Sequence, residues 1–135
     1  MSVFVDTSAL LALLDADDPH HADAVGTWAW LADQGSALLT TNYVIVETIA
    51  VVQHRLGLAA VRTLLGDVMP LIDAIFVDAA THGSAITALV ASGRRQLSLV
   101  DCASFEAMRQ ANVRAAFAYD RHFNEMGFTL DAESA

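Results

Sequence analysis

Short apolar runs alternate with segments of helical composition along the whole chain. The strand-like runs cover residues 3–5, 37–41, 72–78 and 114–119, with a last short candidate at 127–130. Helical patterns cover residues 7–15, 19–34, 42–56, 58–69, 79–92 and 99–112. Nearly uniform apolar strands that alternate with helices are typical of a parallel sheet buried on both faces. We therefore predict an α/β fold with a central, mainly parallel sheet of four to five strands.

Polar residues follow the predicted strands, at the edge where open α/β sheets bind their ligands. Asp6, Asn42, Asp78 and Asp120 each come directly after a strand-like run. Each is equally well explained as a helix N-cap or a turn residue, because Asp and Asn are preferred at both positions. No single residue of this group therefore establishes a site.

Glu47 and Asp101 add two acids inside predicted helices. The positions three and four residues from Glu47 are mainly apolar: Tyr43, Val44, Ala50 and Val51. An ionised carboxylate in apolar surroundings costs several kcal/mol unless it is paired, protonated or bound to a metal. A solvated position on the rim of the helix is the alternative for Glu47. Asp101 follows Ser98 by three residues, which resembles a capping box.

Length and hydropathy favour one folded domain over residues 1–135, since a chain of 135 residues buries a single core. Hydrophobic residues make up 55% of the chain, yet no apolar run approaches the ~18 residues of a membrane span. The N-terminus shows no secretory or transit signal, and the single cysteine, Cys102, excludes an internal disulfide. We expect a cytoplasmic protein with no membrane contact.

Charge is distributed unevenly along the chain. Sixteen acids stand against seven arginines, for a formal net charge of −9, and residues 1–54 carry seven acids and no arginine or lysine. A protein this acidic lacks the general electrostatic attraction to nucleic acid that a basic domain has. Contact with RNA or DNA would therefore require cations or a partner that offsets the negative field.

Two common kinds of chemistry have no motif in this sequence. No glycine-rich phosphate loop follows a strand, which argues against a nucleotide cofactor. The histidines show no pair at metal-ligand helical spacing, so we interpret them as surface or core polar residues: His20, His21, His54, His82 and His122.

Four acids gathered at one sheet edge would need a cation. Unit charges ~5 Å apart repel by roughly 3 kcal/mol per pair at an effective dielectric constant near 20. Oxygen ligands without thiolate or imidazole suit Mg²⁺, with Mn²⁺ as a substitute. Such a site favours phosphodiester hydrolysis by a metal-activated water.

Four segments match a known family in order and spacing: "VFVDTSALLALL", "TTNYVIVET", "LSLVDCASFEAM" and "AFAYDRHFNEMGF". Together they span nearly the whole chain, which resembles the PIN domains and, most closely, the VapC-type toxins of prokaryotic toxin–antitoxin pairs. The resemblance implies a three-layer Rossmann-like fold and an Mg²⁺-dependent endoribonuclease that a cognate antitoxin holds inactive. It also implies a homodimer.

The resemblance assigns roles to individual residues. The four acids are implied as catalytic residues and metal ligands: Asp6, Glu47, Asp101 and Asp120. Ser8 matches a hydroxyl that supports this site, and Asn42 matches a polar position at its edge. Asp78 has no counterpart, and the family's strand order puts it on an edge strand, so we interpret it as a cap.

The arginines are candidates for contact with RNA phosphates or with the antitoxin. The set comprises Arg94, Arg95, Arg109, Arg114 and Arg121. Solvated surface arginines are an equally good explanation for any one of them.

Two other functions stay open at the level of sequence. Asp6 could be the nucleophile of a phosphatase or phosphoacceptor domain, although Ser8 stands where such phosphatases need an acid and the chain has no lysine for a receiver-type site. The chain could also be a non-catalytic PIN-like binding module, in which the acids are caps. The distances between the four carboxyl groups distinguish this module from a nuclease.

Overall fold

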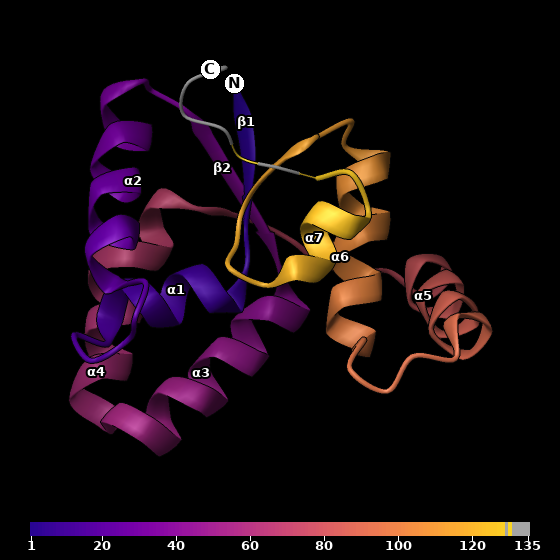
Figure 1. The fold of residues 1–135 in the computed structure, drawn as a ribbon, viewed down its shortest axis with the longest axis horizontal. Coiled ribbons are helices and arrows are strands. Elements are labelled where there is room, and N and C mark those ends of the chain that lie inside the picture. The colour runs from indigo at the N-terminus through magenta and orange to yellow at the C-terminus, as the bar shows by residue number, and fades with distance from the viewer. Residues whose placement is uncertain (129, 131–135) are drawn as a thin grey trace.

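The structure is a computed structural model that describes residues 1–128 and 130 (Figure 1). Its strands are β1 (Ser2–Val5), β2 (Ala37–Thr41), β3 (Asp73–Ile75) and β4 (Ala115–Phe117). Its helices are α1 (Thr7–Leu14), α2 (His21–Asp33), α3 (Asn42–Leu56), α4 (Leu58–Thr63), α5 (Ala79–Ser92), α6 (Leu99–Gln110) and α7 (Arg121–Glu125). Between α4 and β3 lie the short helical turns η1 (Leu64–Val68) and η2 (Met69–Leu71).

The four strands form one parallel sheet in the order β3-β2-β1-β4. Strand β1 is central: Val3 pairs with Leu38 of β2 on one side and with Ala115 of β4 on the other. Its residues Val3, Phe4 and Val5 are almost fully buried, as expected for a strand covered on both faces. The predicted α/β fold with a parallel central sheet is confirmed.

Helices cover the sheet on both sides. In Figure 1, α1, α2 and α4 lie on one side of the strands, and α5, α6 and α7 lie on the other. Helix α3 runs across the lower end of the sheet, where it contacts both α1 and α6. That end carries the carboxyl termini of the strands, so it is the edge where ligands are expected. None of the helices in the described part of the chain is long and apolar enough to cross a membrane.

Capping signals placed several element boundaries correctly. The predicted strand 37–41 and the helices 42–56 and 79–92 have these bounds in the structure. Gly57 ends α3 with φ +89°, a conformation that side chains other than hydrogen tolerate poorly. Thr41 rather than Asn42, the cap suggested by the sequence, caps the start of α3, because its hydroxyl accepts the backbone N–H of Val44 at 3.2 Å.

The predicted helix 58–69 is only partly regular. It is α-helical to Thr63, then widens to a π-type turn in η1 and tightens to a 3₁₀ turn in η2. Gly66 is a weak helix former, and Pro70 has no N–H for a helical hydrogen bond. These two residues explain why the α-helix does not continue.

The predicted strands 72–78 and 114–119 are both longer than β3 (Asp73–Ile75) and β4 (Ala115–Phe117) in the structure. The run 72–78 pairs only over Asp73–Ile75, since the N–H of Val77 instead donates to Oδ1 of Asn42 at 2.8 Å. The candidate strand 127–130 contains residue 129, which lies outside the described residues.

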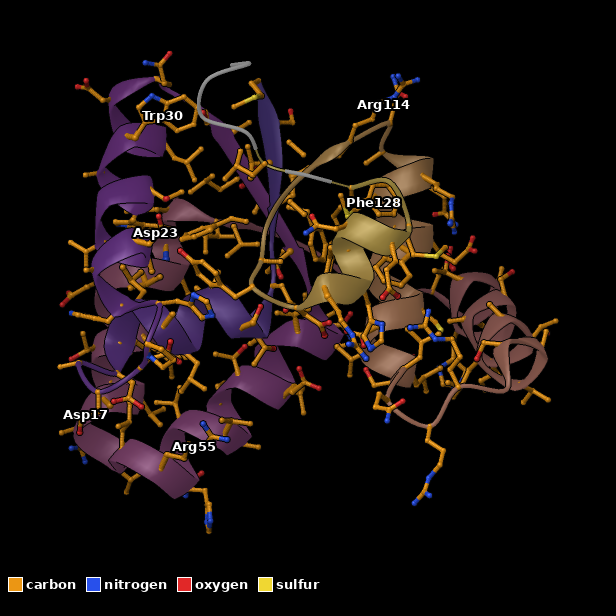
Figure 2. The ribbon with its side chains drawn as sticks, in the orientation of Figure 1. Asp17, Asp23, Trp30, Arg55, Arg114 and Phe128 are labelled. Carbon is orange, nitrogen blue, oxygen red and sulfur yellow. The ribbon has the colours of Figure 1, made fainter. Side chains whose placement is uncertain are left out.

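Aromatic packing holds α7 against the sheet. The Phe123 ring lies 6.2 Å from that of Phe4 in β1 and 5.0 Å from that of Phe105 in α6, measured between centroids. Phe128 stacks on Phe105 at 5.7 Å, and Figure 2 shows it beside α6 and α7. Because Asp120 is the N-cap of α7, this packing determines where its carboxylate lies.

We expect Phe123→Ala to lower the free energy of unfolding by about 3–5 kcal/mol, since it leaves a cavity among three buried elements. Urea denaturation measures the change. Phe76→Ala is the matched control: Phe76 is 76% exposed, so its loss should change stability by no more than about 0.5 kcal/mol. Equal effects of the two variants would contradict this account of the core.

Candidate metal centre

Asp6 is both the cap of α1 and a buried acid at the carboxyl edge of the sheet. It follows β1 directly, and its side chain accepts two hydrogen bonds from Ser8, from the backbone N at 3.1 Å and from Oγ at 2.7 Å. Both hydrogen bonds reach Oδ2, so Oδ1 is not used by the cap. The residue is 3% exposed. Capping and a site role are therefore compatible for this carboxylate.

Burial raises the pKa of Asp6 from 3.8 to about 7, against the opposing effect of the Ser8 hydrogen bonds. The negative charges of Asp101 and Glu47 are smaller contributions to the same upward shift in pKa. Three acids from three separate segments thus lie close enough to influence one another.

Asp101 enters the same edge from the first turn of α6. Ser98 and Asp101 form the predicted capping box: Ser98 Oγ accepts the N–H of Asp101 at 3.0 Å, and Asp101 Oδ2 accepts the N–H of Ser98 at 3.3 Å. Burial raises the pKa of Asp101, and the charges of Asp120 and Glu47 raise it as well. The box orients a buried carboxylate toward other acids.

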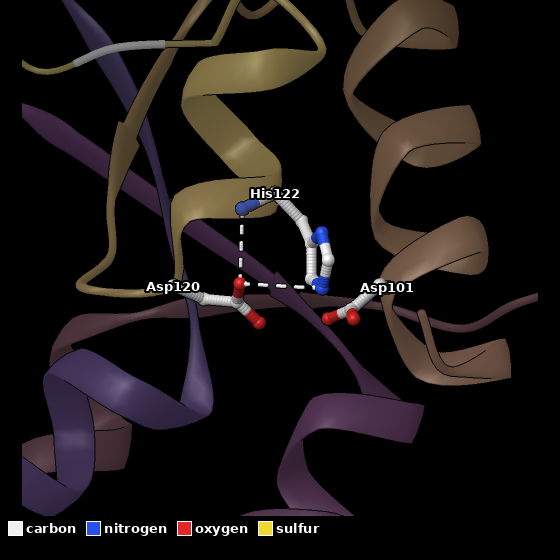
Figure 3. A group of neighbouring side chains, drawn as sticks. All are labelled: Asp101, Asp120 and His122. Atoms are coloured by element: carbon white, nitrogen blue, oxygen red, sulfur yellow. Dashed lines mark hydrogen bonds and ion pairs between the residues drawn. The ribbon is translucent and has the colours of Figure 1, made fainter. Parts of the chain in front are cut away.

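Asp120 is the N-cap of α7 and is partly exposed. Its Oδ1 accepts the backbone N–H of His122 at 2.9 Å. Figure 3 shows the carboxylates of Asp120 and Asp101 with the His122 ring between them. One potential ligand atom from each of these residues lies within 4.8 Å of the others. Two acids 19 residues apart in sequence therefore come within reach of one ion.

Glu47 lies on α3 at the border of this cluster and is partly buried. It lines a shallow hollow together with Asn42, Tyr43, Val46 and Val100. Glu47 is thus partly exposed to solvent, as the alternative of a rim position suggested. Its negative charge nevertheless raises the pKa values of Asp6 and Asp101.

Ser8 connects the first and last acidic segments. Its Oγ donates to Asp6 and accepts the backbone N–H of Tyr119 at 2.9 Å. Tyr119 directly precedes Asp120. This hydroxyl thus holds together two loops that are more than 100 residues apart in sequence.

The other candidate residues have diverse environments. Asn42 accepts the N–H of Val77, and Asp78 caps α5 by accepting the N–H of Thr81 at 2.8 Å, on the edge strand's side of the sheet. Arg94 donates to Glu125 at 2.7 Å, and Arg121 lies 3.8 Å from the same carboxylate. Arg95 is exposed.

His122 was not distinguished from the other histidines by sequence. It is 4% exposed and belongs to the cluster with Asp101 and Asp120. The one available signal was local: the histidine follows a strand-end acid by two residues and precedes a core phenylalanine in "YDRHF". That signal does not separate a core histidine from one that faces a site.

The donor set suits a hard divalent cation. Within the described residues, no arginine forms an ion pair with Asp6, Glu47, Asp101 or Asp120. Buried carboxylates that repel one another and have no arginine partner are stabilised by a cation bound among them. Carboxylate oxygens are the ligands that Mg²⁺ and Mn²⁺ prefer.

The family model "PIN domain" matches residues 3–129 of this chain. A curated relative, the 23S rRNA-specific endonuclease VapC20 of Mycobacterium tuberculosis, is 33% identical over 127 residues, which cover 93% of this chain and 95% of the relative. The crystal structure of M. tuberculosis VapC20, described as a sarcin-ricin loop cleaving toxin, has a TM-score of 0.80 and 31% identity, and covers 94% of this chain and 96% of the other.

Two more distant structures share the fold. VapBC2 from Rickettsia felis, bound to a DNA fragment from its promoter, has a TM-score of 0.70 at 13% identity, and 96% of each chain is covered. FitAcB from Neisseria gonorrhoeae has a TM-score of 0.65 at 16% identity, over 96% of this chain and 94% of the other.

In metal-free protein, we expect the free energy of unfolding to fall as the pH rises from about 4 to 7. The folded-state pKa of Asp6, about 7, lies above its unfolded value near 3.8. The folded state therefore keeps a proton that the unfolded state releases, and this stabilisation is complete below pH ~4 and lost by pH ~7. A shift of this size corresponds to about 4 kcal/mol at most.

Asp6→Asn should remove the Asp6 contribution to this pH dependence, because the amide keeps an oxygen for the cap and does not titrate. The raised pKa of Asp101 leaves a dependence of the same sign. Urea denaturation in EDTA at pH 4, 5.5 and 7 measures it. Asp78→Asn is the matched control. Hydrogen bonds from the backbone N–H and the side chain of Thr81 lower the pKa of Asp78, so its contribution to the pH dependence of stability is confined to pH values below about 4. An Asp6→Asn profile parallel to the wild type would refute the assignment.

Proposed function

Because this chain belongs to the PIN domain family, we propose that it is a metal-dependent endoribonuclease of the VapC toxin type. The observation that carries the proposal is that ligand atoms of Asp101, Asp120 and His122 lie within 4.8 Å of one another, while the charges of Asp6 and Glu47, which lie outside this close group, influence the same set of acids. The four acids come from four segments that are distant in sequence. Helix capping accounts for three of them singly, but it does not require them to meet.

Asp6 and Asp101 are the principal ligands in this proposal, because they are the two buried acids. Each carboxylate accepts a hydrogen bond from a nearby serine, Asp6 from the Ser8 hydroxyl and Asp101 from the Ser98 backbone N–H. Glu47 and Asp120 border the more exposed side, where they can hold an attacking water or a second ion. Mg²⁺ or Mn²⁺ bound here would lower the pKa of a water and stabilise charge on the phosphoryl oxygens. Asp6 and Asp101 release any proton they hold when a cation binds between them.

Ser8 supports the site without taking part in proton transfer. Its hydrogen bond to Asp6 fixes the carboxylate rotamer, and its bond to the Tyr119 N–H fixes the backbone before Asp120. Loss of this hydroxyl would loosen both acids together.

Approach of RNA depends on local rather than overall charge. In Figure 2, Asp17 and Asp23 lie on the α2 side of the molecule and Arg114 lies on the α6 side. Arg95 and Arg121 are exposed and are our candidates for phosphate contact. Arg94 and Asn42 already have protein partners, so contact with RNA by either residue would compete with those bonds.

The likeness to VapC20 supports 23S rRNA as the first substrate to test. A cell that makes a toxin acting on ribosomal RNA needs an inhibitor, so we propose a cognate antitoxin as partner. We also propose that residues 1–135 form a single domain that acts as a homodimer in the cytoplasm.

The two other functions considered from sequence fit the geometry less well. A phosphoacceptor needs an accessible carboxylate, and Asp6 is 3% exposed with Oδ2 bound twice by Ser8. A binding module whose acids serve only as caps would leave the carboxylates dispersed, whereas those of Asp101 and Asp120 lie within reach of one ion.

Mn²⁺ or Mg²⁺ should raise the melting temperature of the wild type by about 5–10 °C at an ion concentration ~100-fold above its Kd. Asp101→Asn should abolish this shift and reduce cleavage of 23S rRNA at least ~100-fold, because it removes a buried ligand charge. Differential scanning fluorimetry and gel analysis of the RNA measure the two effects.

Asp73→Asn is the control, because Asp73 is exposed at the start of β3, away from the carboxyl edge. It should retain both the thermal shift and the cleavage. Cleavage that survives in EDTA would disprove the metal-dependent mechanism. A thermal shift without cleavage of any RNA would favour the binding module.

A further inference from the structure

His122 is the buried polar side chain of α7, a helix whose other buried residue is Phe123. It is 4% exposed, whereas the side chains of Arg121 and Glu125 are 73% and 41% exposed. Its ring projects from α7 between Asp120 and Asp101 (Figure 3). Nε2 lies 3.9 Å from Oδ1 of Asp120. One ring nitrogen is thus directed into the acidic cluster.

The other ring nitrogen, Nδ1, is held from outside the cluster. Nη2 of Arg94 lies 3.2 Å from it, and Oε2 of Glu125 lies 3.4 Å from it. Arg94 and Glu125 are themselves joined at 2.7 Å. Arg94 belongs to the loop between α5 and α6, so these three side chains connect that loop to α7.

The identity of these neighbours determines the tautomer of the imidazole. A guanidinium only donates hydrogen bonds, so its contact with Nδ1 requires that Nδ1 accept. Oε2 of Glu125 accepts a hydrogen bond from Arg94 at 2.7 Å but lies 3.4 Å from Nδ1 of His122. Glu125 is therefore the weaker influence on Nδ1, where it would favour an N–H. In a neutral imidazole the proton then resides on Nε2. The His122 ring therefore presents an N–H to the carboxylates.

The 3.9 Å between His122 Nε2 and Asp120 Oδ1 is too long for a hydrogen bond. The Nε2–H therefore faces the Asp120 carboxylate without donating to it. Catalytic hydrogen bonds are often long in ligand-free sites and shorten when the site is filled. Asp120 is the more exposed acid of the pair, with 31% of its side chain accessible, so its rotamer is the less constrained. A modest rotation about its side-chain bonds would complete the contact.

We propose that His122 is a positioning residue of the metal centre, which holds the Asp120 carboxylate through Nε2–H while Arg94 and Glu125 fix its ring and tautomer. The inference rests on the proposed function, since it assumes that Asp120 serves a bound cation. Contacts that orient a ligand from outside in this way are typically worth ~10–100-fold in metal affinity. Direct ligation by His122 is the competing role, and it would require a free lone pair on Nε2.

The experiment compares His122→Asn with His122→Gln in the full chain. The longer Gln side chain carries its amide nitrogen toward the Nε2 position, whereas Asn reaches only the Nδ1 position. Calorimetric titration measures the Kd of Mg²⁺ and of Mn²⁺ for each variant. We expect His122→Asn to lower the affinity for both ions by ~10–100-fold, and His122→Gln to keep both affinities within ~5-fold of the wild type.

His21→Asn is the matched control, because it removes an imidazole whose Nδ1 contacts a backbone carbonyl, that of Ala12, at 2.8 Å. It should leave both affinities unchanged. Equal losses in the Asn and Gln variants, or no loss in either, would overturn the proposal. A loss confined to Mn²⁺ would also overturn it and identify His122 as a ligand, since imidazole favours Mn²⁺ over Mg²⁺. A wild type that binds neither ion would instead refute the proposed function.

A second measurement covers the case in which His122→Asn does not fold. ¹⁵N NMR of histidine-labelled protein at pH 8, without metal, should show the Nε2–H tautomer for His122 in the wild type. Arg94→Met removes the donor to Nδ1, and the Arg94 side chain is 40% exposed. This variant should populate the Nδ1–H tautomer of His122 and lower the affinity for both ions several-fold. An Nδ1–H tautomer in the wild type would overturn the proposal.

Discussion

Mutual repulsion among buried carboxylates is the constraint on which the rest of this structure depends. Asp6 and Asp101 lie in a low-dielectric edge of the sheet, where burial and neighbouring acids both raise their pKa values. No arginine in the described residues pairs with either carboxylate. The protein instead holds each acid with local N–H and O–H donors, which orient the oxygens but leave most of the negative charge uncompensated. The repulsion among these carboxylates is unfavourable without a cation, whereas a cation bound among them would offset it.

The same side chains cap helices and build the site, and these two roles do not compete. A cap uses one or two lone pairs of a carboxylate, while a carboxylate offers about four. Asp6 accepts from Ser8 through Oδ2, and Asp120 accepts from His122 through Oδ1, so each keeps a second oxygen free of the cap. The cap also fixes the direction in which that second oxygen points. Sequence reasoning treated cap and ligand as alternatives, but the geometry permits both.

Contacts that are distant in sequence give the acidic edge its shape. Ser8 joins the loop after β1 to the loop after β4, and the Phe4, Phe105 and Phe123 rings hold α7 against β1 and α6. Arg94 and Glu125 connect the α5–α6 loop to α7 beside His122. The segment that carries Asp120 is therefore positioned from three directions, although α7 itself is only five residues long.

The sequence by itself determined most of the secondary structure elements, the parallel sheet and the four candidate acids, but it did not predict the short helix α7. Caps, glycine stops and hydrophobic period act within one or two turns, so Asp6, Asp78 and Ser98 could be interpreted locally as caps. Four features were decided only by tertiary structure: the short extent of β3, the influence of the Glu47 charge on Asp6, the pairing of Arg94 with Glu125 and the burial of His122. The physical reason is that these features depend on which layers pack together. Side chains tens of residues apart compete there for the same partner, and no local signal encodes that competition.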